Sequence, residues 1–407
     1  MNRPASHAPL TLLGGLTSAE FLAEYWQKKP LLIRGAFPGF VSPLSPDELA
    51  GLACEDGIEA RLVEEHGKDA NGVDKPWRVS HGPFDEATFA RLPKCDWTLL
   101  VQAVDHYVPE VNALLEHFHF LPRWRLDDIM ISYAPPGGSV GPHVDQYDVF
   151  LLQASGTRHW QLGGKVADDA PIIRGIDLRI LERFKVQPDQ EWLLEPGDML
   201  YLPPGMAHHG VSKSSDCMTF SVGFRALSAD ESITSFADYL GEQLPNSRRY
   251  GDPDLSPPTH PGEIDDAAIA RMRALILNTL DDPEQMLQWF GRAMTQPKYP
   301  DQLIGAESPT VIAHLVAELQ EGTLLERTLG SRFAYRDHGN SRATLFVDGD
   351  GLTCETGLAV LLAGDRPIDA DALDHPGSAE LLVQLLDRGS LCWPYADDEH
   401  EEEDEHP

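Results

Sequence analysis

Two short motifs, far apart in the chain, constrain its fold more than any other feature. The first is His143-Val144-Asp145, and the second ends at His208 with the spacing G-x5-P-x-G-x2-H. Short apolar segments separated by glycine and proline surround both motifs, from about residue 124 to residue 224. This texture predicts an all-β barrel or sandwich at the centre of the chain. We therefore expect both motifs to meet inside one β core.

The two motifs together supply a candidate set of metal ligands. Side chains alternate along a strand, so His143, Asp145 and Tyr147 are expected on one face of an extended segment. The second motif resembles the second motif of the cupins, in which a turn aims a histidine into the barrel. That spacing selects His208 over His209, whose side chain should point the other way. Two histidines and a carboxylate leave one face of an octahedron open, which suits non-haem Fe(II) oxygen chemistry, whereas a structural zinc site is closed by four ligands.

The open coordination positions call for a bidentate co-substrate and dioxygen. A 2-oxo acid would chelate through its carboxylate and ketone, and its far carboxylate would then need a cation. Arg158 is the strongest candidate because its planar fork binds a carboxylate bidentately. Lys165 and Lys213 are weaker candidates. Ser132, on the strand expected before the first motif, is placed to donate a hydrogen bond to the same ligand, although a serine that lines a barrel often only fills space.

Charge and cysteine content restrict the partners and the compartment. The formal charge is 32 minus 65, or −33, which argues against binding to nucleic acid or to anionic membranes and favours a basic protein partner. The five cysteines are dispersed, as in a reduced cytosolic protein. The N-terminal residues lack the apolar core of a signal peptide, and no apolar run approaches the length of a membrane span. We expect a cytoplasmic protein.

Periodicity predicts the other elements. Helices are expected over 17–26, 45–55 and 96–120, with a strand over 30–34, as cladding for the core. Core strands are expected over 125–133, 148–153, 158–162, 192–194, 199–202 and 218–224. On the first of these strands Asp128, Met130 and Ser132 share a face. Beyond residue 226 we expect helices over 230–242, 265–280, 283–294, 309–321, 357–363 and 379–388, and strands over 332–336, 343–347 and 352–355.

Three runs of sequence identify a resemblance. They are D-D-I-M-I-S-Y-A-P-P-G-G-S-V-G-P-H-V-D-Q-Y-D-V-F-L-L-Q from Asp127, G-T-R-H-W from Gly156 and P-P-G-M-A-H from Pro203. They resemble the JmjC-type bacterial ribosomal oxygenases, which are 2-oxoglutarate- and Fe(II)-dependent arginine hydroxylases of the sixteenth large-subunit ribosomal protein. The resemblance implies an α+β protein with a double-stranded β-helix core of the jelly-roll, cupin type, over residues 1–226 (core strands about 124–226). It also implies a helical dimerisation segment over 227–296 and a winged-helix-like module over 297–395. Residues 396–407 are expected to be an acidic, disordered tail.

The resemblance also implies roles for individual residues. His143, Asp145 and His208 would bind iron, and Arg158, helped by Ser132, would hold the far carboxylate of 2-oxoglutarate. The substrate arginine would enter a pocket lined by Asp128, Met130 and Tyr147. The implied reaction is 3-hydroxylation of an arginine in a basic ribosomal protein, with release of succinate and CO2, by a homodimer.

Several alternatives stay open at this point. The same core chemistry would serve hydroxylation of a histidine or another residue in a different protein, or lysine demethylation. A metal-binding cupin scaffold without catalysis is also consistent with the residues. The apolar stripes of the helices expected over 230–242 and 265–294 would suit either a dimer interface or an intramolecular core.

Overall fold

The computed structural model describes residues 8–65, 77–167 and 169–394. The chain divides into two compact units, Met1–Ala226 and Leu227–Pro407. The acidic tail expected over 396–407 lies outside the described residues. None of the helices in the described ranges is long and apolar enough to span a membrane.

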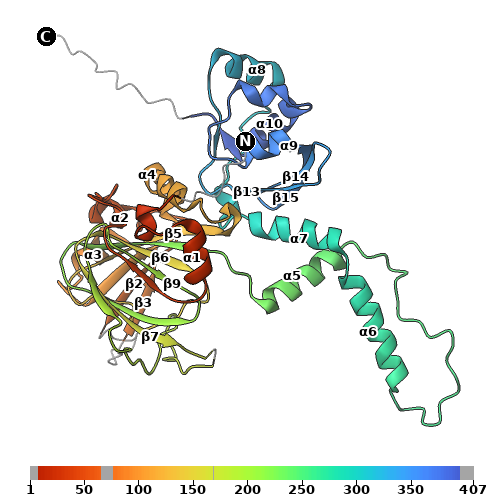
Figure 1. The fold of residues 1–407 in the computed structure, drawn as a ribbon, viewed down its shortest axis with the longest axis horizontal. Coiled ribbons are helices and arrows are strands. Elements are labelled where there is room, and N and C mark those ends of the chain that lie inside the picture. The colour runs from red at the N-terminus through yellow and green to blue at the C-terminus, as the bar shows by residue number, and fades with distance from the viewer. Residues whose placement is uncertain (1–7, 66–76, 168, 395–407) are drawn as a thin grey trace. The chain divides into compact units, whose positions relative to one another are not determined.

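Two antiparallel sheets form the core of the first unit (Figure 1). The larger has the strand order β1-β9-β6-β11-β5-β4-β2-β3, and the smaller has the order β10-β7-β8. This is the β core that the sequence predicts. The strands are β1 (Leu31–Ile33), β2 (Ala60–Glu65), β3 (Trp77–His81), β4 (Trp97–Val101), β5 (Leu126–Ala134), β6 (Val149–Ser155), β7 (Arg158–Lys165), β8 (Glu191–Leu194), β9 (Met199–Leu202), β10 (Met206–Ser212) and β11 (Cys217–Phe224).

The two sheets enclose an apolar layer. Leu151 of β6 and Leu200 of β9 pack against Trp160 and Leu162 of β7 in one buried cluster. Because side chains alternate along each strand, every second residue of β5, β7 and β10 faces the same interior. These alternate positions carry the predicted site residues.

Short helices cover the other face of the large sheet. They are α1 (Ser18–Glu24), α2 (Pro46–Leu52), α3 (Glu86–Ala90) and α4 (Pro109–Asn112). Thr17 and Ser45 are the N-cap residues of α1 and α2, and each forms a complete capping box. The N-termini of both helices could therefore be predicted from the sequence. Phe21 and Leu49 bury their side chains completely in the main core, beside residues of β6, β9 and β11.

Two sequence predictions in this unit are wrong. The helix expected over 96–120 begins as a strand, β4, and only short helical segments follow: Val104–His106, Pro109–Asn112 and Ala113–Phe118. All five residues of β4 are buried. Periodicity cannot distinguish a short apolar segment in a buried strand from the apolar face of a helix. The segment 143–147 is not a continuous strand, since His143 makes only an isolated bridge. Strands β2, β3 and β10 were not predicted.

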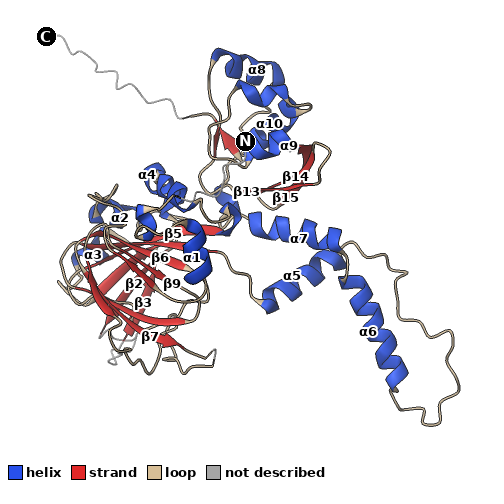
Figure 2. Ribbon diagram, in the orientation of Figure 1, coloured by secondary structure: helices blue, strands red, loops and turns tan. Residues whose placement is uncertain are grey.

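The second unit is mainly helical, with a small three-stranded sheet (Figure 2). Its predicted elements are present within a few residues of their expected limits. The helices are α5 (Ala229–Gly241), α6 (Asp266–Leu280), α7 (Pro283–Thr295), α8 (Ile312–Glu321), α9 (Thr356–Leu362) and α10 (Ser378–Asp387). The strands are β12 (Glu326–Arg327), β13 (Phe333–Asp337), β14 (Arg342–Val347), β15 (Asp350–Glu355) and β16 (Leu391–Cys392).

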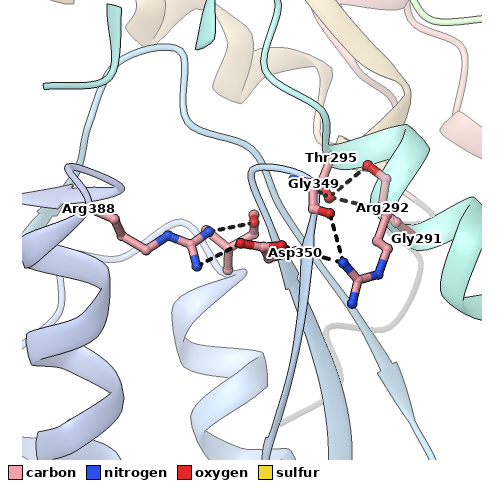
Figure 3. Close-up of polar contacts among 7 residues, drawn as sticks. Gly291, Arg292, Thr295, Gly349, Asp350 and Arg388 are labelled. Atoms are coloured by element: carbon pink, nitrogen blue, oxygen red, sulfur yellow. Dashed lines mark hydrogen bonds and ion pairs between the residues drawn. The ribbon is translucent and has the colours of Figure 1, made fainter. Parts of the chain in front are cut away.

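Polar contacts join helix α7 to the β14–β15 turn (Figure 3). Arg292 of α7 and Arg388, directly after α10, place nitrogens 3.4 and 3.3 Å from the two carboxylate oxygens of Asp350. A side chain at Gly291 would put its Cβ 2.4 Å from the ring of Phe346, so only glycine allows this approach. Helix α7 therefore packs with the small sheet as well as with α5.

Candidate metal centre and co-substrate site

The backbone itself brings the two metal-binding motifs together. The N–H of His143 donates to the carbonyl of His208 at 3.0 Å, and the N–H of His208 donates to the carbonyl of His143 at 3.0 Å. The two imidazole rings lie 4.1 Å apart between centroids. This isolated bridge fixes the register of the two segments at the positions of the two histidines.

Each histidine is held in one tautomer by a nearby carbonyl. Nδ1 of His143 lies 2.9 Å from the carbonyl oxygen of Gly141, and Nδ1 of His208 lies 2.9 Å from that of Met206. A ring nitrogen that faces a carbonyl carries the proton, so Nε2 of both rings keeps its lone pair for a metal.

Asp145 completes the group. Its Oδ2 lies 4.0 Å from Nε2 of His143 and 3.5 Å from Nε2 of His208. In the described part of the chain these three residues form the one group whose ligand atoms lie within 4.8 Å of one another. Two imidazole nitrogens and one carboxylate oxygen on a single face fit a non-haem iron centre with open positions. His209 is not in the group, and its ring packs instead against Phe184.

Burial makes His208 a neutral ligand. It is 2% exposed, and desolvation together with the neighbouring His143 lowers its pKa from 6.5 to about 4. Metal ligation needs the unprotonated ring. The site therefore holds His208 ready for metal throughout the neutral range.

The lowered pKa predicts acid sensitivity of the metal-free protein. Between about pH 6.5 and about pH 4 the unfolded chain binds a proton at His208 that the folded protein excludes. Stability should therefore fall as the pH decreases through this window, by up to about 3 kcal/mol, and level off below it. Urea unfolding in the presence of a chelator measures this. His208→Asn should reduce this pH dependence without removing it, since burial also lowers the pKa of His209 to about 4. An equal pH dependence in that variant would contradict the assignment.

Arg158 occupies the interior as a buried cation. Its side chain is 3% exposed, and its Nε and Nη2 find no hydrogen-bond partner among the described residues. A buried, unpaired guanidinium is costly unless a ligand supplies the counter-charge. A carboxylate is the group that matches its fork. The alternative cations Lys165 and Lys213 are exposed.

Trp160 lies between the arginine and the metal ligands. Its ring centroid is 5.8 Å from Cζ of Arg158 and 5.8 Å from the ring of His208. Its Nε1 is also buried without a partner in the described chain. Trp160 was missed in the sequence, although it stands two residues after Arg158 on the same strand face. The site thus runs from the metal ligands along β7 to Arg158.

Ser132 lies on the inner face of β5, opposite Thr219 of β11. It is 5% exposed, and its Oγ donates to the Thr219 carbonyl at 3.4 Å, a long and weak bond. That hydroxyl can be redirected toward a ligand at small cost.

The three predicted pocket residues lie on β5 and two residues after Asp145. Asp128 is 3% exposed, and Met130 packs with Leu100 and Ile180. Tyr147 is 43% exposed. The Asp145 carboxylate, burial and the Asp128 carboxylate all raise the pKa of Tyr147.

A buried carboxylate anchors the residue next to Tyr147. Asp148 is fully buried and accepts hydrogen bonds from the Tyr201 hydroxyl at 2.7 Å and the Gln27 amide at 2.9 Å. Arg125 approaches the same carboxylate at 3.2 Å. Burial raises the pKa of Asp148 in spite of these partners. The network ties the N-terminal cladding to the corner that carries Tyr147.

Comparisons with known proteins agree with this geometry. Residues 113–232 match the family model of a JmjC domain, and residues 278–392 match that of a ROXA-like winged helix. The chain is 36% identical over 370 residues to the ribosomal protein uL16 3-hydroxylase of Escherichia coli, covering 91% of this chain and 96% of that protein. It belongs to the bacterial JmjC ribosomal oxygenases. The predicted fold class, with a JmjC core and a C-terminal winged helix, is confirmed.

Solved structures of a ribosomal oxygenase show the same fold. The crystal structure of E. coli YcfD has a TM-score of 0.83 and 35% identity, over 93% of this chain and 98% of that one. A second structure of YcfD, in complex with cobalt and 2-oxoglutarate, has a TM-score of 0.80 and 34% identity over the same shares of the two chains. The likeness therefore extends beyond the β core of this ribosomal oxygenase, and the second YcfD structure contains cobalt and 2-oxoglutarate.

Proposed function

We propose that this ribosomal oxygenase uses Fe(II), 2-oxoglutarate and dioxygen to hydroxylate C3 of an arginine side chain in ribosomal protein uL16, the sixteenth protein of the large subunit. The observation that carries the proposal is a three-ligand metal face in the same β core as a buried arginine that lacks a carboxylate. The 36% identity to a uL16 3-hydroxylase supports the substrate and the position of the hydroxyl group.

The proposed roles follow from the contacts of each residue. His143 and His208 bind the metal through Nε2, and Asp145 binds it through a carboxylate oxygen. Arg158, with Ser132, pairs with the far carboxylate of 2-oxoglutarate. Dioxygen is the oxidant: with iron bound at the site, one of its oxygen atoms would enter the arginine side chain and the other would enter 2-oxoglutarate, which would leave as succinate and CO2. The apolar layer between the sheets keeps water away from the reacting groups.

The substrate side of the site selects a guanidinium. Asp128 supplies the counter-charge, while the Met130 side chain and the Tyr147 ring pack along the arginine. The net charge of −33 draws a basic ribosomal protein toward the enzyme. The contacts of Asp128, Met130 and Tyr147 with the arginine would form before the chemical step. Together they would determine which carbon of the side chain faces the metal.

Mass spectrometry of ribosomal proteins tests the function. The enzyme is incubated with Fe(II), 2-oxoglutarate and isolated ribosomal proteins, and a gain of one oxygen is expected on a uL16 arginine. A gain on a histidine or in another protein would replace this substrate with one of the alternatives. The absence of any gain, together with no succinate formation, would favour the scaffold.

Asp128 predicts how substrate binding depends on charge. Asp128→Asn should raise the KM for a uL16 arginine peptide about 30-fold or more, since removing one partner of a buried charge pair costs about 2–5 kcal/mol. A peptide with citrulline, which is neutral and of the same shape, should bind weakly and equally to both proteins. Steady-state kinetics and competition assays measure these values. An unchanged KM for the arginine peptide would remove Asp128 from the pocket.

We also propose that α6 forms a homodimer interface. None of its residues is buried, although Ile269, Met272 and Ile276 line one face and are 59%, 42% and 49% exposed. An apolar stripe of this kind is normally covered by a partner. A second copy of the chain is the occupant that closed symmetry favours.

The dimer proposal predicts a change of mass on substitution. Ile269→Glu combined with Ile276→Glu should convert the protein from a dimer to a monomer, measured by light scattering after gel filtration. Ala267→Glu combined with Asn278→Glu adds the same charge on the opposite face of α6 and should leave the dimer intact. A wild-type protein that is monomeric at micromolar concentration would contradict the proposal.

A further inference from the structure

Strand β7 carries three buried hydrogen-bond donors that have no acceptor among residues 8–65, 77–167 and 169–394. They are Nε and Nη2 of Arg158 and Nε1 of Trp160. The two residues are 3% and 5% exposed. Because residues two apart on a strand point to the same side, both side chains enter the interior together. A buried tryptophan N–H usually has a hydrogen-bond partner, so this one is an unused donor inside the site.

The opposing strand holds the indole in place without using its N–H. Trp160 pairs directly with Gly210 of β10. A Cβ at Gly210 would lie 2.7 Å from Cζ3 and 2.9 Å from Cε3 of the indole, so a side chain there would displace the ring. Gly210 has no positive φ, and the backbone therefore does not require glycine at this position. The glycine instead gives the six-membered ring room to lie against β10.

Trp160 lies near both ends of the proposed co-substrate site. Its ring centroid is 5.8 Å from Cζ of Arg158 and 5.8 Å from the ring of His208. A 2-oxo acid that bridges the metal ligands and Arg158 would therefore lie beside the indole. The chelating end of such an acid gives its oxygens to the metal, whereas the far carboxylate offers two oxygens with about four lone-pair sites. One carboxylate can thus accept from both side chains.

We infer that Trp160 is a further binding residue for the co-substrate, and that its Nε1–H donates to the far carboxylate of 2-oxoglutarate beside Arg158. A single anionic group then supplies the acceptor for all three buried donors of β7. Hydrogen bonds to an ionised oxygen are stronger than neutral ones, so the indole adds affinity for an acid with a second carboxylate. The inference rests on the proposed function, because it concerns the same co-substrate.

The variant Trp160→Phe tests the inference in the full-length enzyme loaded with Co(II). Phenylalanine keeps an aromatic ring and removes the N–H. The affinity for 2-oxoglutarate should fall about tenfold or more, as expected for the loss of one hydrogen bond to a charged group, and the affinity for Co(II) should stay within about twofold. The analogue 2-oxopentanoate, in which a methyl group replaces the far carboxylate, should bind equally to both proteins. Titration calorimetry measures each affinity.

The neighbouring tryptophan supplies a matched control. Trp192 of β8 pairs with Trp160 and is partly exposed. Trp192→Phe removes the same kind of N–H from the same sheet and should keep the affinity for 2-oxoglutarate within about twofold. An equal loss in this variant would overturn the inference, because the effect would then belong to the packing of the sheet.

A spectroscopic test uses the wild-type enzyme and needs no variant to fold. The chain has eight tryptophans, and isotope-labelled tryptophan resolves their indole N–H signals by nuclear magnetic resonance in enzyme loaded with diamagnetic Zn(II). Addition of 2-oxoglutarate should move one indole proton downfield, since a hydrogen bond to a carboxylate deshields it. Addition of 2-oxopentanoate should not. The absence of any downfield shift with bound 2-oxoglutarate would overturn the inference.

The other outcomes are distinct. An unchanged affinity of Trp160→Phe for 2-oxoglutarate would overturn the inference. Equal losses for 2-oxoglutarate and 2-oxopentanoate would also overturn it, because the indole would then only shape the cavity. If the wild-type enzyme does not bind 2-oxoglutarate at all, the proposed function fails, which differs from failure of the inference alone.

Discussion

Replacing Asp145 by alanine is expected to abolish metal binding and turnover. The carboxylate is the one anionic ligand of the three, and its Oδ2 lies within 4.0 Å of both histidine Nε2 atoms. Loss of residues that merely support a ligand typically costs about 10- to 100-fold in affinity or activity, so loss of the ligand itself should cost more than about 100-fold. Titration with Co(II), followed by its absorbance, reports binding, and succinate formation reports turnover.

Two further variants test whether the loss of metal binding is specific to the Asp145 carboxylate. Asp145→Asn keeps the shape and removes the charge, and it should also lose most of the affinity. Asp56→Ala removes an exposed acid of the same unit and should bind metal as the wild type does. Turnover retained by Asp145→Ala at saturating iron would refute the ligand set.

Replacing Arg158 by methionine is expected to separate co-substrate binding from stability. The affinity for 2-oxoglutarate should fall by a factor of about 100 or more, because the carboxylate loses a buried charged partner worth about 3 kcal/mol. The stability of the protein without 2-oxoglutarate should stay the same or rise, since Nε and Nη2 of Arg158 have no partner in the described chain. Removing an unpaired buried charge relieves its desolvation penalty.

Thermal unfolding with and without 2-oxoglutarate measures both effects. The wild-type protein should gain about 2.7 kcal/mol at a co-substrate concentration 100 times its Kd, and the variant should gain no more than about 0.4 kcal/mol at that concentration. Arg158→Lys keeps the charge without the fork and should fall between the two. Arg78→Ala, which removes a half-exposed arginine paired with Glu64, is the control. A variant that is destabilised and still binds 2-oxoglutarate would show that Arg158 has a structural role.

Much of the site was predictable because its residues obey simple periodicities. His208 stands at a fixed distance from two turn residues, and Arg158 follows the turn at Gly156. Asp128, Met130 and Ser132 alternate on one strand, and the structure keeps them on the inner face. Local sequence decides each of these placements.

The remaining parts depend on tertiary packing. Strand β4 was predicted to be helical because all of its residues are buried. Leu99 and Leu100 point to opposite faces of the sheet, so the sequence lacks the alternation of apolar and exposed polar residues that identifies a strand. Gln102 follows that strand, and no local pattern connects it to Asp128, whose carboxylate accepts from its amide at 2.6 Å. The extended segment that carries Asp145 is fixed by the His143–His208 bridge and by the bond from the N–H of Gly205 to its carbonyl, both of which are long-range contacts. Such contacts cannot be predicted from sequence periodicity.

The pair of backbone hydrogen bonds between His143 and His208 also bears on metal selectivity. The bonds, with the carbonyls at each Nδ1, make the ligand face rigid without help from an ion. The affinity of such a site for divalent ions generally increases from iron to cobalt to nickel. Affinity alone would therefore not favour iron over cobalt or nickel at this face, and the supply of metal ions in the cell would bear on which ion occupies it.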